Sequence, residues 1–184
     1  MREETIKLYK INELKENIQE EVIEKYRYIN INYEWYLPLF EDFKERLKAI
    51  GITCETFYFD FERENYIMME KAEVINKNLF LEKAGYGKEI LLNELEENKI
   101  YFDVYIGKSR YENYVNIEVY HEEENKENKY FDIDEDALTE FLNNILKEFL
   151  KELKKEYNYL ISDEAVKEKL EINEYEFLED GRIY

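Results

Sequence analysis

The segment from Asp134 to Leu160 places the strongest constraint on the fold, because its apolar residues recur three and four apart over its whole length. That spacing is typical of an amphipathic helix with one buried face. The face is broad, as in a core helix, and wider than the seam of a coiled coil. It comprises Leu138, Phe141, Leu142, Ile145, Leu146, Phe149, Leu150, Leu153 and Tyr157. The segment is therefore predicted to be a core helix.

The start of this segment, FDIDEDALTEFLNNIL, also resembles a calcium loop in its first residues, where aspartates stand two apart. An EF-hand loop needs a glycine at position 6 and a glutamate at position 12. Counted from Asp132, those positions hold Ala137 and Asn143. The aspartates are better explained as the first turn of the helix, where the helix dipole favours negative charge.

Two helices are expected in the first third of the chain. Asn12 is the predicted cap of one that runs to about Ile29, with a buried stripe of Leu14, Ile18, Val22 and Tyr26. A second fits Tyr33 to Ile50, with Gly51 as its stop and one face formed by Trp35, Leu39, Phe43 and Leu47. Pro38 leaves two alternatives: it lies in the first turn of a shorter helix, or it kinks a longer one.

Strand patterns lie between the helices. Thr53 to Phe61 alternates large apolar and polar residues, and Asn65 to Val74 is its expected partner. After a predicted helix at about Lys88 to Glu97, the segments IYFDVYIG and YVNIEVYHE indicate a hairpin around Gly107 to Asn113. Ser162 is the predicted cap of a short helix, and Asp180-Gly181 indicates a tight turn. This order predicts a single α+β domain, residues 1–184, with an antiparallel sheet packed against helices.

Charge is the most prominent compositional feature, because 45 Asp and Glu against 26 Lys and Arg give a formal net charge of −19. Hydrophobic residues still make up 45% of the chain, and 16% are aromatic, so a packed core is expected and disorder is not. The charge repels nucleic acid and anionic membranes and steers the protein toward basic partners. Solubility alone is the other explanation of such a charge.

The acidic residues cluster, and one cluster adjoins the predicted core helix. Clustered carboxylates can imitate the phosphate track of DNA, or cover a positive groove, or form only a solvated loop. The candidates for partner contact in this cluster are Glu122, Glu123, Glu124, Glu127, Asp132 and Asp134.

The predicted hairpin carries the second set of candidates. One face is apolar, and the other combines tyrosines with acids: Tyr101, Asp103, Tyr105, Tyr114, Glu118 and Tyr120. Tyrosine offers a large rigid contact area with a polar tip and is enriched at binding hot spots. Acids among these rings would suit a basic partner surface. The alternative is that a helix covers this face and the tyrosines reach the solvent at its edge.

Catalytic and metal-binding patterns are weak. Cys54 and His121 are the only cysteine and histidine, and no third group is indicated that would orient them as a catalytic dyad. Clusters of Cys and His and phosphate-binding glycine loops are absent from the sequence. We therefore expect no enzyme activity, no cofactor and no metal. The single cysteine, the lack of an apolar leader and the lack of a membrane span predict a cytoplasmic protein.

Two segments carry a resemblance, KINELKENIQEEVIEKYRYININYEWY near the start and KEYNYLISDEAVKEKLEINEYEFLEDGRIY at the end. They resemble small acidic accessory proteins encoded by bacteriophages and prophages, and together they cover about a third of the chain. The resemblance assigns no active-site residue. It implies a role in the host cytoplasm, where acidic accessory proteins of this kind inhibit nucleic-acid-handling machinery such as restriction and CRISPR effectors.

These expectations together favour a non-enzymatic inhibitor that binds a basic surface of a host nucleic-acid-handling protein. In one form of this hypothesis, the inhibitor acts as a nucleic-acid mimic. It would bind neither nucleic acid nor membrane directly. Two alternatives belong to other classes: a metal hydrolase with carboxylate ligands, and a structural homo-oligomer, for instance a homodimer.

Overall fold

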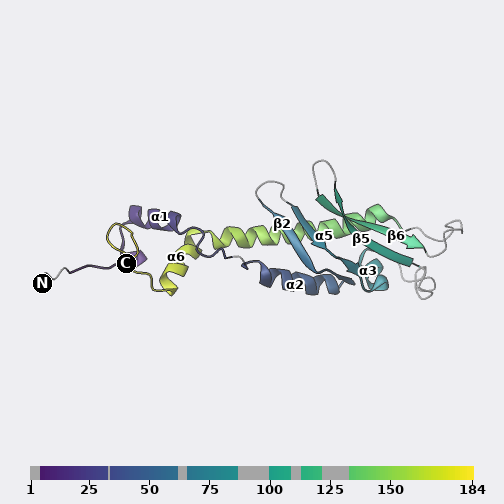
Figure 1. Ribbon diagram of the computed structural model, residues 1–184, viewed down its shortest axis with the longest axis horizontal. Coiled ribbons are helices and arrows are strands. Elements are labelled where there is room, and N and C mark those ends of the chain that lie inside the picture. Colours follow the sequence, from purple (N-terminus) through teal and green to yellow (C-terminus); the bar gives the residue numbers. More distant parts are fainter. Residues whose placement is uncertain (1–4, 33, 62–65, 87–99, 109–112, 122–132) are drawn as a thin grey trace. The chain divides into compact units, whose positions relative to one another are not determined.

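The computed structural model describes residues 5–32, 34–61, 66–86, 100–108, 113–121 and 133–184 (Figure 1). In these residues, helices combine with three small antiparallel sheets of two strands each, which confirms the predicted α+β class. The chain divides into two compact units: Met1–Tyr36 with Lys154–Tyr184, and Leu37–Leu153. The first unit unites both ends of the chain, and the second holds all three sheets. That residues 1–184 fold as one domain stays a prediction.

In the first unit, the 3-10 turn η1 (Ile11–Glu13) and helix α1 (Glu16–Lys25) pack against helix α6 (Asp163–Ile172). The predicted helix start at Asn12 is wrong, since Leu14 adopts an extended conformation that separates η1 from α1. The predicted stripe is correct. Its residues belong to, or pack against, a core cluster of Ile11, Leu14, Val22, Ile23, Val166, Leu170 and Phe177.

The end of the first unit follows the local sequence signals. The Ser162 side chain accepts a hydrogen bond from the Ala165 N–H and caps α6, as predicted. The turn at Asp180-Gly181 folds the last residues back, so that Phe177 forms antiparallel bridges with both Ile183 and Tyr9.

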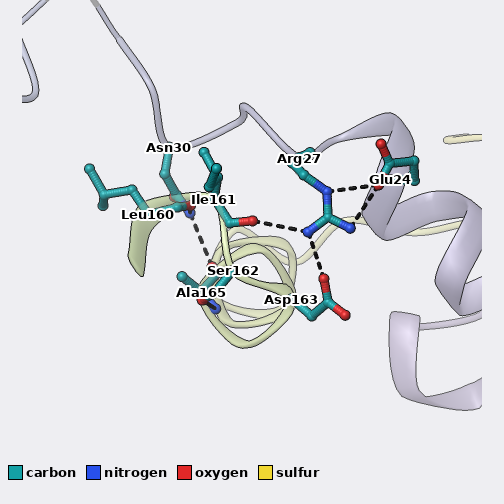
Figure 2. A network of polar contacts seen from close by, with 8 residues as sticks. All are labelled: Glu24, Arg27, Asn30, Leu160, Ile161, Ser162, Asp163 and Ala165. Atoms are coloured by element: carbon teal, nitrogen blue, oxygen red, sulfur yellow. Dashed lines mark hydrogen bonds and ion pairs between the residues drawn. The ribbon is translucent and has the colours of Figure 1, made fainter. Parts of the chain in front are cut away.

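Arg27, just after α1, connects this unit internally (Figure 2). Its guanidinium donates to Glu24 at 2.7 Å, to Asp163 at 2.6 Å and to the carbonyl oxygen of Ile161 at 3.0 Å. The hydrogen bonds to the carboxylates of Asp163 and Glu24 hold the pKa of Arg27 above its usual value. Nearby, the Asn30 amide donates to the carbonyl oxygens of Leu160 and Ala165. Both side chains thus satisfy backbone groups at the junction before α6.

In the second unit, helix α2 spans Leu37–Lys48. Pro38 is its second residue, so the shorter-helix alternative is correct, because a proline in the first turn removes no hydrogen bond of the helix. Phe40, Phe43 and Leu47 are buried. Gly51 follows at φ +84°, a left-handed conformation that suits glycine after a helix end.

Strands follow α2 in two antiparallel pairs. Strand β1 (Ile52–Thr53) pairs with β4 (Glu73–Val74), and β2 (Thr56–Asp60) pairs with β3 (Tyr66–Glu70). The predicted pairing of the two strand segments is therefore confirmed. Phe57, Ile67 and Met69 are buried on the inner face of the β2–β3 hairpin.

Helix α3 (Lys77–Lys83) was not expected from the sequence. Its signal was the Asn76 side chain, which accepts a hydrogen bond from the Leu79 N–H as an N-cap. Seven residues are too few to show a helical period clearly. The helix predicted at Lys88 to Glu97 lies outside the described residues.

Helix α5 (Glu135–Leu160) confirms the predicted core helix. Within the second unit, Phe149 of α5 stacks on Phe43 of α2 with ring centroids 3.8 Å apart and planes 10° apart. Arg46 lies over this pair and binds Glu152 through two hydrogen bonds of 3.0 and 2.6 Å. The buried residues of the helix are Leu138, Leu142, Leu146, Phe149, Leu150 and Leu153.

Strands β5 (Ile100–Lys108) and β6 (Asn113–His121) form the predicted hairpin. Phe102 pairs with Val119 and Val104 with Ile117, so the apolar face predicted from the sequence is confirmed by the register. Figure 1 shows the hairpin beside α5 and α3. This hairpin positions the candidate site.

Candidate partner-binding surface

The two faces of the β5–β6 hairpin differ in exposure. On the inner face, Val115 and Ile117 are buried, and the Phe102 ring packs edge-on against Phe80 of α3 at 6.0 Å. On the other side, Tyr101 is 44% exposed and Tyr105 36% exposed, and Asp103 between them is exposed as well. We define the outer face as Tyr101, Asp103, Tyr105, Asn116 and Glu118. No helix covers it among the described residues, so the structure favours the exposed alternative.

Two acids meet on the outer face. Asp103 of β5 pairs directly with Glu118 of β6 in the strand register. Directly opposed side chains have Cβ atoms about 4.5–5.5 Å apart, and like charges in such positions destabilise the sheet. The strand register therefore places two carboxylates of like charge next to each other at the centre of this face.

Tyr105 is held in place on the outer face by hydrogen bonds. Its hydroxyl donates to the Glu118 carboxylate and accepts from the side-chain amide of Asn116. The Asn116 carbonyl oxygen in turn accepts from the Thr139 hydroxyl of α5 at 3.2 Å. This chain of hydrogen bonds orients an exposed ring, which reduces the entropy that a binding partner would need to remove.

Tyr101 already has a cation at its ring. Lys77, the first residue of α3, places its Nζ 4.7 Å from the ring centroid of Tyr101. This distance is within the range of a cation–π interaction. The ring of Tyr101 therefore has an intramolecular cation–π partner in Lys77.

The outer edge of β6 is capped by side chains of α5, an arrangement the sequence analysis missed. The N–H groups of Val119, Ile117 and Val115 donate to Glu135, Thr139 and Asn143 at 2.9, 3.1 and 3.1 Å. These three acceptors are spaced four residues apart, so they lie along one side of the helix. The sequence signal was this polar row beside the apolar face of α5. The arrangement protects the strand edge from pairing with another chain.

The other predicted contact residues have different outcomes. Tyr114 pairs with Gly107 and Tyr120 with Tyr101 in the backbone register, but their side chains lie outside the described part. Asp134 is exposed, and its carboxylate accepts from the Ala137 N–H, which is a capping bond of α5. This cap confirms the helix-start interpretation of the acidic stretch. The remaining acidic candidates, which are Glu122, Glu123, Glu124, Glu127 and Asp132, lie outside the described residues.

Cys54 has the environment of a structural cysteine. It is only 7% exposed, and burial raises the pKa of its thiol to about 11. A nucleophilic cysteine needs a lowered pKa and access to substrate. Cys54 therefore lacks the properties of the nucleophile in a catalytic dyad with His121. The side chain of His121 lies outside the described part.

In the described ranges, no three His, Cys, Asp or Glu side chains gather as metal ligands would. Nor does any described helix combine the length and apolar character needed to cross a membrane. Comparisons with protein-family models, curated proteins and solved structures found no match to this chain.

Proposed function

We propose that this protein is a non-enzymatic inhibitor that binds a basic surface of a partner protein through the outer face of the β5–β6 hairpin. The observation that carries the proposal is the opposed pair of acids, Asp103 and Glu118, between exposed tyrosines. A surface with this arrangement stabilises itself by taking up a cation.

The chemistry of the outer face suits an arginine or lysine side chain. A guanidinium has five N–H donors and can bridge two carboxylates. Its positive charge would also offset the repulsion between Asp103 and Glu118. The rings of Tyr101 and Tyr105 add contact area and cation–π attraction, and Lys77 over Tyr101 is an intramolecular example of that attraction.

The class of partner follows from the charge of the whole chain. A net charge of −19 disfavours nucleic acid and accelerates association with basic proteins. Proteins that handle nucleic acid carry such basic surfaces. Together with the resemblance of the chain ends to phage accessory proteins, this supports a host defence nuclease, such as a CRISPR effector, as the target in the host cytoplasm. The acidic surface would then occupy the groove meant for phosphates.

The two alternatives gain no specific support. The hydrolase needs a gathering of carboxylate ligands, and the described residues supply none. A homo-oligomer needs an uncovered apolar surface, whereas the apolar face of α5 contacts α2, α3 and the β2–β3 hairpin in the second unit. We therefore keep the binding protein as the proposed function.

The experiment is a binding titration with a defined basic probe, a fluorescent arginine-rich peptide of about 20 residues, followed by anisotropy at low and high salt. The double variant Tyr101→Ala/Asp103→Asn should bind about tenfold more weakly, which corresponds to about 1.4 kcal/mol. The matched control is Tyr159→Ala/Glu140→Gln, which removes one exposed tyrosine and one exposed acid elsewhere. Equal loss in both variants would mean that net charge alone attracts the peptide, and would contradict the proposal.

The same variants identify the natural partner. Host lysate treated with nuclease is passed over the immobilised protein, and the retained proteins are identified by mass spectrometry. A basic nucleic-acid-binding protein retained by the wild type and the control, and lost from the Tyr101/Asp103 variant, is the expected result. Retention that is insensitive to near-molar salt would contradict an electrostatic mode of binding, because screening weakens exposed charge pairs.

A further inference from the structure

The β2–β3 hairpin repeats a tyrosine–glutamate pair of the β5–β6 hairpin in the same register. Tyr58 is opposite Met68, and Glu70 lies two residues further along β3. Tyr105 is likewise opposite Asn116, and Glu118 lies two residues further along β6. In both hairpins the tyrosine hydroxyl donates diagonally across the strands to the glutamate, for Tyr58 at 3.0 Å.

The Tyr58–Glu70 pair is exposed in the same manner as its counterpart. Tyr58 is 50% exposed, whereas its neighbour Phe57 is buried on the inner face. The hydrogen bond to Glu70 raises the pKa of Tyr58, so the tyrosine hydroxyl keeps its proton. An exposed hydrogen bond of this kind adds little to stability, so folding alone does not explain why the pair recurs.

The Glu70 carboxylate has an oxygen atom available to accept a hydrogen bond from a cation. Glu70 receives the tyrosine hydroxyl on Oε2, and its Oε1 accepts no hydrogen bond from any described residue. A carboxylate has acceptor sites for further donors, and the adjacent ring offers a face for a cation–π contact. The nearest lysine in sequence, Lys71, forms its ion pair with Glu55 and interacts with Glu70 only through a weaker charge attraction. A positive side chain from outside the molecule therefore fits this place.

The two pairs belong to one structural unit. Both hairpins lie within Leu37–Leu153, and β3 lies beside β6. Their separation is therefore set by the fold of this unit.

We propose that the Tyr58–Glu70 pair is a second binding site for an arginine or lysine side chain, and that one basic partner is held at both hairpins. This inference rests on the proposed function of the outer face. It adds a contact residue set that the sequence patterns did not indicate. Two linked sites increase affinity without any new chemistry, because the second contact forms within the complex.

The test uses the same arginine-rich peptide and the full chain. The double variant Tyr58→Phe/Glu70→Gln removes the hydroxyl and the charge, and it keeps the size of both side chains. We expect its dissociation constant to rise about tenfold, and that of a four-site variant, which adds Tyr101→Ala/Asp103→Asn, to rise well beyond either change alone. The control Tyr159→Ala/Glu140→Gln should bind like the wild type.

The outcomes separate the second site from the first. If the Tyr58/Glu70 variant binds like the control while the Tyr101/Asp103 variant is weakened, the second site is refuted and the proposed function stands. If neither variant is weakened, both proposals fail. NMR spectra of the wild type test the second site without any variant. The peptide should change the chemical shifts of the backbone amides of Tyr58 and Glu70. Unchanged shifts at a saturating peptide concentration would overturn the inference.

Discussion

Asp103 and Glu118 lie directly opposite each other on neighbouring strands of an exposed hairpin face, so two negative charges meet at the position where a cross-strand pair interacts most strongly. A hairpin optimised only for stability would have opposite charges there. We propose that the outer face gives up some folding stability in return for affinity toward cations, and this proposal has a measurable consequence.

The variant Asp103→Asn is expected to be more stable than the wild type by roughly 0.2–1 kcal/mol, because it removes a like-charge pair. Its affinity for the arginine-rich peptide should fall at the same time. Urea unfolding measures the free energy, and Glu140→Gln on the exposed side of α5 is the control for a lower net charge. If both variants gain the same stability, the effect is general charge repulsion, and the opposed pair has no special role.

The capped edge of β6 predicts a loss of stability in Thr139→Val. Valine has nearly the shape of threonine but cannot accept the Ile117 N–H or donate to Asn116. A half-buried backbone donor left without its partner costs about 1–3 kcal/mol. Thr139→Ser keeps the hydroxyl and should retain more of the stability, although it removes a methyl group. Equal unfolding midpoints for the valine and serine variants would show that the hydrogen bond is not important.

Gly181 is expected to tolerate alanine less well than Gly85, although both have positive φ, +80° and +97°. A Cβ at Gly181 would lie 2.8 Å from a Val22 methyl and 2.9 Å from an Ile18 methyl, whereas a Cβ at Gly85 meets nothing within 4 Å. Both variants carry the backbone strain of roughly 1–2 kcal/mol, and Gly181→Ala adds overpacking of about 1–3 kcal/mol. Thermal unfolding of the pair isolates the second effect. A Gly181 variant as stable as the Gly85 variant would contradict the close approach of this turn to α1.

Cys54 should react slowly with thiol reagents in the folded protein. At pH 8 its thiolate fraction is reduced by a pKa of about 11 compared with the usual 9.0, and burial blocks access. Alkylation in urea should be faster by more than about tenfold. Because the folded pKa is raised, this group favours the folded state below pH 9, and the contribution is lost as the pH rises from 9 toward 11. Equal rates with and without urea would mean that Cys54 is exposed.

Local signals in the sequence predicted many of the elements. The period of α5, the Ser162 cap and the apolar alternation of the β5–β6 hairpin each depend on neighbouring residues. Such patterns predict structure reliably because each concerns the buried or exposed face of a single helix or strand. The start of α1 shows the limit: Asn12 has the right residue type for a cap, but the chain forms a 3-10 turn there instead.

The candidate site was predictable only in part. Alternation alone assigned Tyr101, Asp103 and Tyr105 to one face, but it left open whether a helix would cover them. The Tyr58–Glu70 hydrogen bond could not be predicted, because it depends on the register between two strands, and the sequence alone does not define that register. The polar row on α5 was visible as a spacing, but its partner strand was not.

The sequence by itself determined the α+β class, the core face of α5, the two faces of the β5–β6 hairpin and the excess of negative charge. Only the tertiary structure decided that both chain ends join in one unit, that α5 caps the edge of β6, and that the two hairpins share one tyrosine–glutamate geometry. The physical reason is the range of the interactions. Periodicity and capping act between residues a few positions apart, whereas exposure and cross-strand contact depend on which distant segments pack together.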